Sequence, residues 1–257
     1  MKNITIVALL LIVSVKSYSQ TSDVIVSDRP GQTNPPTVVP VGIFQLETGF
    51  SRESSKTGDI LTTNFLYNTS LIRIGLIENC ELRLNFEYAG TRIDSVAQSS
   101  TVKGFNPISV GSKLAVCPEK GMIPQTSFNI SLAMPYFGKQ EFRPPYLAPS
   151  FFLLMQNTLS DRYSLGYNLG LQWDGSQPNA TAVYSISLSI TVLENVSIFG
   201  ECYGFSTEKS ATDYHSDFGC AYLINNNLQL DISGGIALNA TIPDSFIGCG
   251  LAWRIGK

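Results

Sequence analysis

Residues 163–173 read Tyr-Ser-Leu-Gly-Tyr-Asn-Leu-Gly-Leu-Gln-Trp, so apolar side chains occupy every second position and small or polar ones lie between them. Residues 81–88, Glu-Leu-Arg-Leu-Asn-Phe-Glu-Tyr, repeat the pattern with charges at the polar positions. A period of two predicts a β-strand with one apolar face. An apolar face rich in Tyr and Trp, opposite a charged face, is typical of a transmembrane β-barrel with a wet interior.

The same alternation recurs along the chain and predicts twelve strands. Most have the length of about 9–11 residues with which a tilted strand crosses a bilayer. Their expected bounds are Ile43–Arg52, Thr63–Ile77, Cys80–Tyr88, Phe105–Cys117, Ile123–Met134, Ala148–Leu159, Tyr163–Trp173, Thr181–Leu193, Val196–Phe205, Ser216–Leu223, Leu228–Ile236 and Ser245–Arg254.

The connections between these strands alternate in length. The longer ones are 53–62, 89–104, 135–147, 174–180, 206–215 and 237–244, and the tight ones are 78–79, 118–122, 160–162, 194–195 and 224–227. Short periplasmic turns and longer outer loops produce this rhythm in barrels, whereas a secreted β-sandwich would alternate in polarity without it. We therefore expect an all-β fold, a twelve-stranded antiparallel transmembrane β-barrel over residues 43–257.

The first 19 residues have the features of a signal peptide. Lys2 gives a positive start, Ile4–Val15 is almost entirely apolar, and small residues precede Gln20. The apolar run is too short to span a bilayer as a helix, so we expect cleavage before Gln20 and export to the outer membrane of a Gram-negative bacterium. Residues 20–42 contain four prolines, which oppose ladder pairing. They predict an extended N-terminal arm, either in the periplasm or in the barrel mouth.

Charge and cysteine content exclude several classes of protein. Cleavage would remove Lys2 and Lys16, leaving 15 basic against 20 acidic residues and a net charge of −5. A basic footprint for nucleic acid is therefore absent. The five cysteines form no CxxC pair and have no zinc-ligand spacing, and they are interpreted as small apolar residues, with disulfides left open. We expect no metal and no cofactor.

Ten charged residues fall on the inward parity of the predicted strands. Facing lipid, an Arg or Lys near the bilayer midplane would cost about 2–4 kcal/mol. The basic residues on the second to fourth strands form one group, and the acidic residues on the ninth to eleventh strands form another. In a ring of twelve strands these two arcs lie opposite each other, so they could set an electric field across the lumen. Local pairing is the alternative. The candidate pore-lining residues are Glu47, Arg73, Glu81, Arg83, Glu87, Lys113, Glu201, Asp217, Asp231 and Arg254.

An enzymatic site is not expected. The single histidine, His215, is adjacent to Ser216, and neighbours on a strand point to opposite faces, so the two are poorly placed as base and nucleophile. We expect His215 to lie solvated at the outer rim. No residue is assigned a catalytic role.

A second signal begins at residues 27–33, Ser-Asp-Arg-Pro-Gly-Gln-Thr, and continues with Val-Pro-Val-Gly at 39–42 and Phe-Gln-Leu-Glu-Thr-Gly-Phe at 44–50. These motifs resemble the opening of an outer-membrane transporter family, frequent in Bacteroidetes-type bacteria, that is named for the MetA-pathway of phenol degradation. The shared motif residues at the start are Asp28, Arg29, Pro30 and Thr33; further matches are 73–76, 81–83, 111–113 and 229–234. The resemblance implies an outer-membrane barrel labelled a transporter, not an activity on phenol.

Two functions follow as expectations. The first is a porin-like diffusion channel for an unidentified small solute. The second is an occluded barrel with a structural, adhesive or anchoring role. In either case the expected partners are outer-membrane lipid and the outer-membrane assembly machinery.

Overall fold

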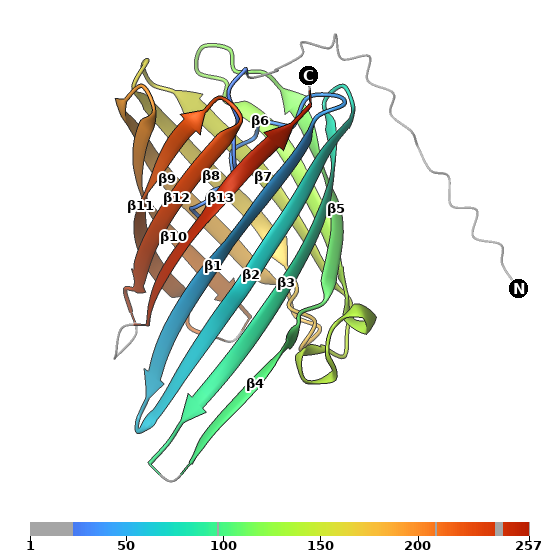
Figure 1. The fold of residues 1–257 in the computed structure, drawn as a ribbon, viewed down its shortest axis with the longest axis vertical. Helices are drawn as coiled ribbons and strands as arrows, with labels where there is room; N and C mark the ends of the chain where they lie inside the picture. Colours follow the sequence, from blue (N-terminus) through green and yellow to red (C-terminus); the bar gives the residue numbers. More distant parts are fainter. Residues whose placement is uncertain (1–22, 97, 209, 240–243, 257) are drawn as a thin grey trace, which may run out of the picture.

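The computed structural model describes residues 23–96, 98–208, 210–239 and 244–256, which form one tilted β-barrel (Figure 1). The predicted signal peptide lies outside the described residues. The strands are β1 (Phe44–Thr57), β2 (Ile60–Ile77), β3 (Cys80–Asp94), β4 (Ser99–Phe105), β5 (Ile108–Cys117), β6 (Gln125–Met134), β7 (Ala148–Thr158), β8 (Tyr163–Gln172), β9 (Thr181–Leu193), β10 (Val196–Thr207), β11 (Asp213–Asn225), β12 (Leu228–Ala237) and β13 (Ser245–Ile255). Two 3₁₀ turns, η1 (Pro135–Phe137) and η2 (Gln140–Phe142), lie between β6 and β7.

The sheet closes on itself with antiparallel neighbours throughout. β1 pairs with both β2 and β13, and β3 pairs with β2 along its whole length. On its other side β3 pairs with β4 over residues 88–94 and with β5 over residues 80–85. β4 and β5 are therefore two halves of one barrel strand, and the barrel has the twelve strands that the sequence predicts.

The strand predicted over Phe105–Cys117 is interrupted by Pro107. Proline has no backbone N–H to donate to the ladder. The preceding residue, Asn106, bonds the backbone oxygen of Glu87 through its own N–H at 3.0 Å, and its side chain donates to the Glu87 carboxylate at 2.8 Å. The strand thus changes register at this point without leaving the barrel wall.

The loops predicted over 53–62 and 89–104 are wrong, because most of these residues are strand. β1 and β2 are joined by a tight turn at Gly58, and β3 continues to Asp94. Residues 53–57 read Glu-Ser-Ser-Lys-Thr, with polar side chains on both faces. A strand segment beyond the membrane needs no apolar face, so the period-two signal disappears there.

The outward face of the barrel is apolar and the inward face is polar. Leu169, Phe218 and Ile232 are 57%, 72% and 52% exposed, whereas the charged side chains Arg73, Glu81 and Lys113 are fully buried. This arrangement inverts that of a water-soluble protein and is the one expected of a barrel in lipid. Across the described residues, no helix is long and apolar enough to cross a membrane. All five cysteines are free.

Candidate functional site

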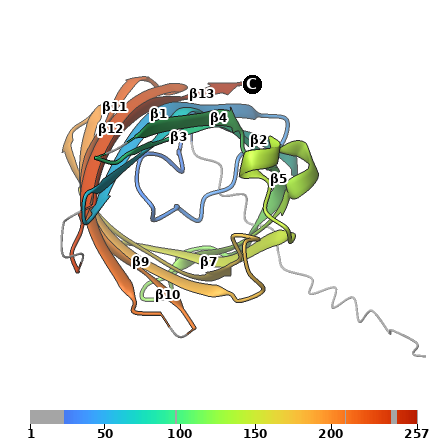
Figure 2. The ribbon, with the colours of Figure 1, turned by 90° about the horizontal axis from the view of Figure 1, so that it is seen from below.

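The described part of the N-terminal arm, residues 23–42, lies inside the barrel; we call it the luminal arm. Figure 2 shows it as a loop within the ring of strands. The Ile25 N–H donates to the Asn226 oxygen at 2.7 Å, beside the turn between β11 and β12, and the Gly42 N–H donates to the Gly75 oxygen at 3.0 Å. The arm therefore enters and leaves at the end of the barrel that carries the short turns. The sequence left open whether the arm lies in the periplasm or in the barrel mouth, and the structure places it inside the barrel.

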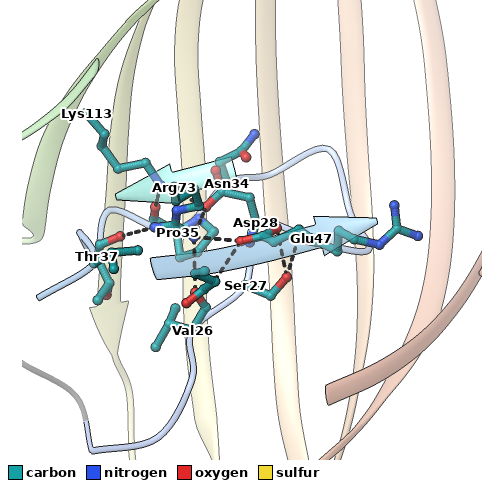
Figure 3. Close-up of polar contacts among 12 residues, drawn as sticks. Val26, Ser27, Asp28, Asn34, Pro35, Thr37, Glu47, Arg73 and Lys113 are labelled. Atoms are coloured by element: carbon teal, nitrogen blue, oxygen red, sulfur yellow. Dashed lines mark hydrogen bonds and ion pairs between the residues drawn. The ribbon is translucent and has the colours of Figure 1, made fainter. Parts of the chain in front are cut away.

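Asp28 of the luminal arm reaches three cations on the barrel wall, and Figure 3 shows two of them, Arg73 and Lys113. Its carboxylate accepts hydrogen bonds from Lys113 Nζ at 2.8 Å, Arg83 Nη2 at 2.5 Å and Arg73 Nη1 at 3.1 Å. These residues come from β5, β3 and β2, which are consecutive in the barrel wall. The three basic residues of the predicted arc therefore lie close together, and the arm supplies a negative charge that pairs with all of them.

Two wall carboxylates complete this cluster. Glu47 accepts from Arg73 Nη1 at 2.9 Å and from Ser27 Oγ at 2.9 Å, while Glu81 accepts from Arg73 Nε at 2.8 Å. Glu81 also accepts from Arg83 Nη1 at 2.6 Å. The Asp28 cluster, defined as Asp28, Glu47, Arg73, Glu81, Arg83 and Lys113, thus balances three carboxylates against three cations.

Burial and charge act in opposite directions on Asp28. Burial alone would raise the pKa of its carboxyl, but Arg73, Arg83 and Lys113 outweigh burial and hold the pKa well below its usual range. Asp28 is therefore ionised in the docked arm. Because Arg73 also donates to the backbone oxygens of Val26 and Thr37 at 3.1 and 2.9 Å, removing it would leave several buried acceptors without their donor.

Arg29 contacts the barrel wall on both sides of the closing seam between β1 and β13, and its Nη1 donates to Thr69 Oγ1 on β2 at 3.3 Å. Its guanidinium forms a bidentate pair with Asp231 on β12, with Nε and Nη2 donating at 3.1 and 2.9 Å. Gly49 on β1 and Gly250 on β13 face each other in the register, and a Cβ on either would collide with this guanidinium. The two glycines therefore make room for the Arg29 side chain against the closing seam of the barrel.

The next turn of the arm is held by Glu201 on β10. The backbone N–H groups of Gln32 and Thr33 donate to its two carboxylate oxygens, the second at 2.9 Å. Thr33 Oγ1 also donates to Ser185 Oγ on β9 at 2.8 Å. All four motif residues noted in the sequence, Asp28, Arg29, Pro30 and Thr33, thus lie in the stretch of arm that crosses the lumen.

The arm separates two cavities. One, of about 280 Å³, is lined on the wall by residues next to the short turns, including Ser164, Ser197 and Leu223. The other, of about 400 Å³, is lined by residues next to the long loops, including Phe205 and His215. Both are bounded by the same piece of the arm, Arg29, Pro30 and Gly31. The arm is therefore the partition between two compartments of the lumen.

The remaining inward candidates have separate positions. Glu87 accepts from the side chain of Asn106, and Asp217 is buried beside its register partner Glu201. Arg254 donates to the Asn227 side chain at 3.0 Å and to the Asp23 backbone oxygen at 2.5 Å. The candidate residues thus line the lumen or its short-turn mouth, and their role in permeation stays a prediction.

The structure changes two of the expectations drawn from the sequence. His215 lies next to the long loops, as expected, but it is half-buried and not simply solvated, because its ring stacks on Tyr203 with centroids 5.0 Å apart and planes 6° apart. The opposed arcs do not face each other across an open lumen, because the arm lies inside the ring of strands (Figure 2): Asp28 pairs with the three basic residues, Arg29 pairs with Asp231, and the Thr33 N–H donates to Glu201. Local pairing, the alternative, is what the distances from Arg73 to Glu47 and from Arg83 to Glu81 show.

Sequence reasoning missed the arm as the partner of the wall charges. The signal was present in the adjacent opposite charges of Asp28 and Arg29, followed by Pro30 and Gly31 in a segment unable to form a strand. Within the described residues, no group of three His, Cys, Asp or Glu side chains is placed to hold a metal ion.

The family and the fold both have known relatives. A family model described as "Putative MetA-pathway of phenol degradation" matches residues 27–255. No curated protein is similar enough in sequence to match the chain.

Several solved outer-membrane barrels have a similar fold. The COG4313 outer membrane channel from Pseudomonas putida F1 superposes with a TM-score of 0.65 at 11% identity, covering 88% of this chain and 99% of that one. The KdgM porin in complex with disordered oligogalacturonate gives 0.55 at 10% identity, with 82% and 99% covered. The transport unit of the autotransporter AIDA-I from Escherichia coli gives 0.57 at 12% identity, with 84% and 91% covered. At these identities the likeness concerns the fold.

Proposed function

The chain belongs to the MetA-pathway family whose model it matches, and from this premise we propose that it is an outer-membrane channel in which movement of the luminal arm opens a path for a small polar solute. The observation that carries the proposal is the pair of cavities on either side of the arm. Among the described residues, Arg29, Pro30 and Gly31 line both cavities and lie between them. Displacing this piece would join the two into one path.

The hydroxyl and amide groups of the smaller cavity favour a polar solute. This cavity carries the hydroxyls of Ser164, Ser187, Ser189 and Ser197 together with the amides of Gln156 and Gln229. Hydroxyl and amide groups can replace the hydration of a permeating molecule without binding it so tightly that it cannot leave. The charges of the Asp28 cluster, in contrast, are paired with the arm or with one another.

The cellular setting follows from the same barrel. We propose that residues 1–19 are removed on export, that the short turns face the periplasm, and that the barrel lies in the outer membrane of a Gram-negative bacterium, in contact with its lipid and inserted by its assembly machinery. The apolar outward face and the unequal connections support this placement.

A reversible disulfide between the arm and the barrel wall tests whether conduction depends on movement of the arm. Thr33 and Ser185 bring their hydroxyl oxygens within 2.8 Å, so a Thr33→Cys/Ser185→Cys pair is close enough for a disulfide once the native cysteines are replaced. In planar bilayers, the oxidised protein is expected to conduct near baseline and to recover on reduction. Equal conductance in both states, above baseline, would overturn a path that depends on the arm.

The control places the same chemistry in the wall. Ser131 on β6 and Ser150 on β7 are register partners whose hydroxyls lie 2.7 Å apart and bond each other. A Ser131→Cys/Ser150→Cys pair is expected to leave conductance insensitive to oxidation. Absence of conductance from every variant in both states would support the occluded barrel instead, a role that the buried Asp28 cluster favours.

A further inference from the structure

We propose that the outward face of the β1–β4 hairpins binds the phosphate groups of an anionic lipid in the outer leaflet. The inference uses the membrane placement of the proposed function but not the permeation path. Figure 1 shows these hairpins reaching farther beyond the ring than the other strands, at the end with the long loops.

The relevant side chains share one face of the sheet. Ala89 points inward and is 6% exposed, so its neighbours Tyr88 and Gly90 point outward. In the register, Arg52 of β1 lies opposite Phe65 of β2, Phe65 opposite Gly90 of β3, and Gly90 opposite Lys103 of β4. We call this line of four residues the cation row; it runs across four strands at one level of the barrel.

A continuous aromatic band lies directly below the cation row, toward the membrane. Phe50, Tyr67, Tyr88 and Phe105 contact one another, with ring centroids 6.5, 6.0 and 5.1 Å apart in that order. Phe105 is 56% and Phe50 38% exposed. Aromatic girdles of this kind mark the level of the lipid headgroups in outer-membrane barrels. The band therefore fixes where the bilayer surface lies on these strands.

The two cations of the row are held against aromatic rings. Lys103 Nζ lies 4.7 Å from the centre of the Tyr67 ring, and Arg52 Cζ lies 6.0 Å from that of Phe65. The absence of a side chain at Gly90 permits this arrangement, because a Cβ there would come within 2.8 Å of the Tyr67 ring and 3.1 Å of Lys103 Cγ. Lys103 is thereby positioned two residues beyond Phe105, roughly 7 Å farther along the strand.

The outward face near the cation row is positively charged, whereas the whole molecule is negatively charged. The mature chain is expected to be acidic, yet Arg52, Lys103, Arg92 and Lys56 all point outward here, and Asp94, an acid on the same face, pairs with Arg92 at 2.8 Å. Cations just outside an aromatic girdle meet the phosphates of the headgroup layer, where Arg and Lys bind them by charge-assisted hydrogen bonds. A phosphorylated lipid satisfies both the apolar band and the cation row.

The test measures lipid retention by the refolded full chain in detergent. Bis-phosphorylated lipid A is titrated into the wild type and into Arg52→Gln/Lys103→Gln, and the bound fraction is read by native mass spectrometry. The apparent affinity is expected to fall roughly 30-fold in the variant, about fivefold for each cation removed. Lipid A without phosphates is expected to bind both proteins equally weakly.

The matched control removes two exposed cations from the opposite end, Lys120→Gln/Arg162→Gln, and is expected to bind phosphorylated lipid A as the wild type does. Equal affinity of wild type and Arg52→Gln/Lys103→Gln would overturn the proposal, as would equal binding of lipid with and without phosphates. Folding is followed by heat-modifiable gel mobility and permeation by conductance. Both are expected to be unchanged, so failure here is distinct from failure of the channel.

Discussion

At the scale of single residues, the unusual feature is a pair of neighbours of opposite charge, Asp28 and Arg29, that pair with different strands of the barrel wall: Asp28 with β2, β3 and β5, and Arg29 with β12. Each is charged, and each ends on counter-charges that sit on strands distant in the sequence. Buried ion pairs do not by themselves stabilise a fold, because desolvation offsets much of their attraction. Their use here is positional, because each charge fixes one point of the arm against particular strands of the wall.

Among the residues of the Asp28 cluster, Arg73 is the one whose substitution we expect to lower the free energy of unfolding most. It contacts Asp28, Glu47 and Glu81, and its side chain is fully buried. Arg73→Met leaves these carboxylates without their shared donor, and we expect the free energy of unfolding to fall by about 3–5 kcal/mol. Denaturant unfolding in detergent, read by heat-modifiable gel mobility, measures the loss.

Arg92→Met is the matched control for that experiment. Arg92 also pairs with a carboxylate, Asp94, but its side chain is 54% exposed, so removing it should cost about 0–1 kcal/mol. A loss from Arg73→Met as small as that from Arg92→Met would show that the Asp28 cluster contributes little to the stability of the barrel.

At the scale of elements, the strands inside the membrane could be predicted from the sequence, and the β9 bounds agree to the residue. Alternation is strong there because one face must be apolar and the other polar. The hairpins beyond the bilayer lack this requirement, so residues 89–104 looked like a loop. For the interruption between β4 and β5, the sign in the sequence was Pro107 within a predicted strand, since proline cannot donate to the ladder.

The candidate site was predictable in part for a related reason. Parity assigns Arg73, Arg83 and Lys113 to the lumen, because the two arginines lie between apolar neighbours and Lys113 precedes Leu114. It cannot say what they pair with, since partners such as Asp28 and Lys113, 85 residues apart, are brought together only by barrel closure and arm docking. Local sequence thus fixes which face a side chain takes, while the closed barrel fixes its partner.

The facing of β3 can be tested with neighbouring substitutions. Leu84 points outward and Asn85 inward, where its amide lies 3.4 Å from the Glu87 carboxylate. Leu84→Arg places a charge in lipid and should cost about 2–4 kcal/mol, whereas an arginine at position 85 gains Glu87 as a partner. Heat-modifiable mobility after refolding reports assembly. Normal assembly of Leu84→Arg together with failure of Asn85→Arg would mean that the facing is wrong by one residue.

At the scale of the whole molecule, closure and the arm together define two unlike ends. The C-terminal strand β13 finishes at Ile255, at the same end where the arm enters, so both described termini lie beside the short turns (Figure 1). An even number of membrane crossings requires this. The opposite end carries the long hairpins, the larger cavity and the cation row, which are the features suited to contact with the cell exterior.

The orientation of these ends can be tested on intact cells. Val96, in the β3–β4 hairpin, is 89% exposed, and Asp161 lies exposed in the tight turn between β7 and β8. With the native cysteines replaced, Val96→Cys should react with a membrane-impermeant maleimide from outside, while Asp161→Cys should react only after the outer membrane is disrupted. The expectation has a physical basis: long connections must be carried across the membrane during assembly, whereas short turns can stay on the side from which the strands enter. Strong labelling of Asp161→Cys with none of Val96→Cys would reverse the barrel. It would also put the cation row in the periplasm, away from the outer leaflet, and place the arm at the outer mouth.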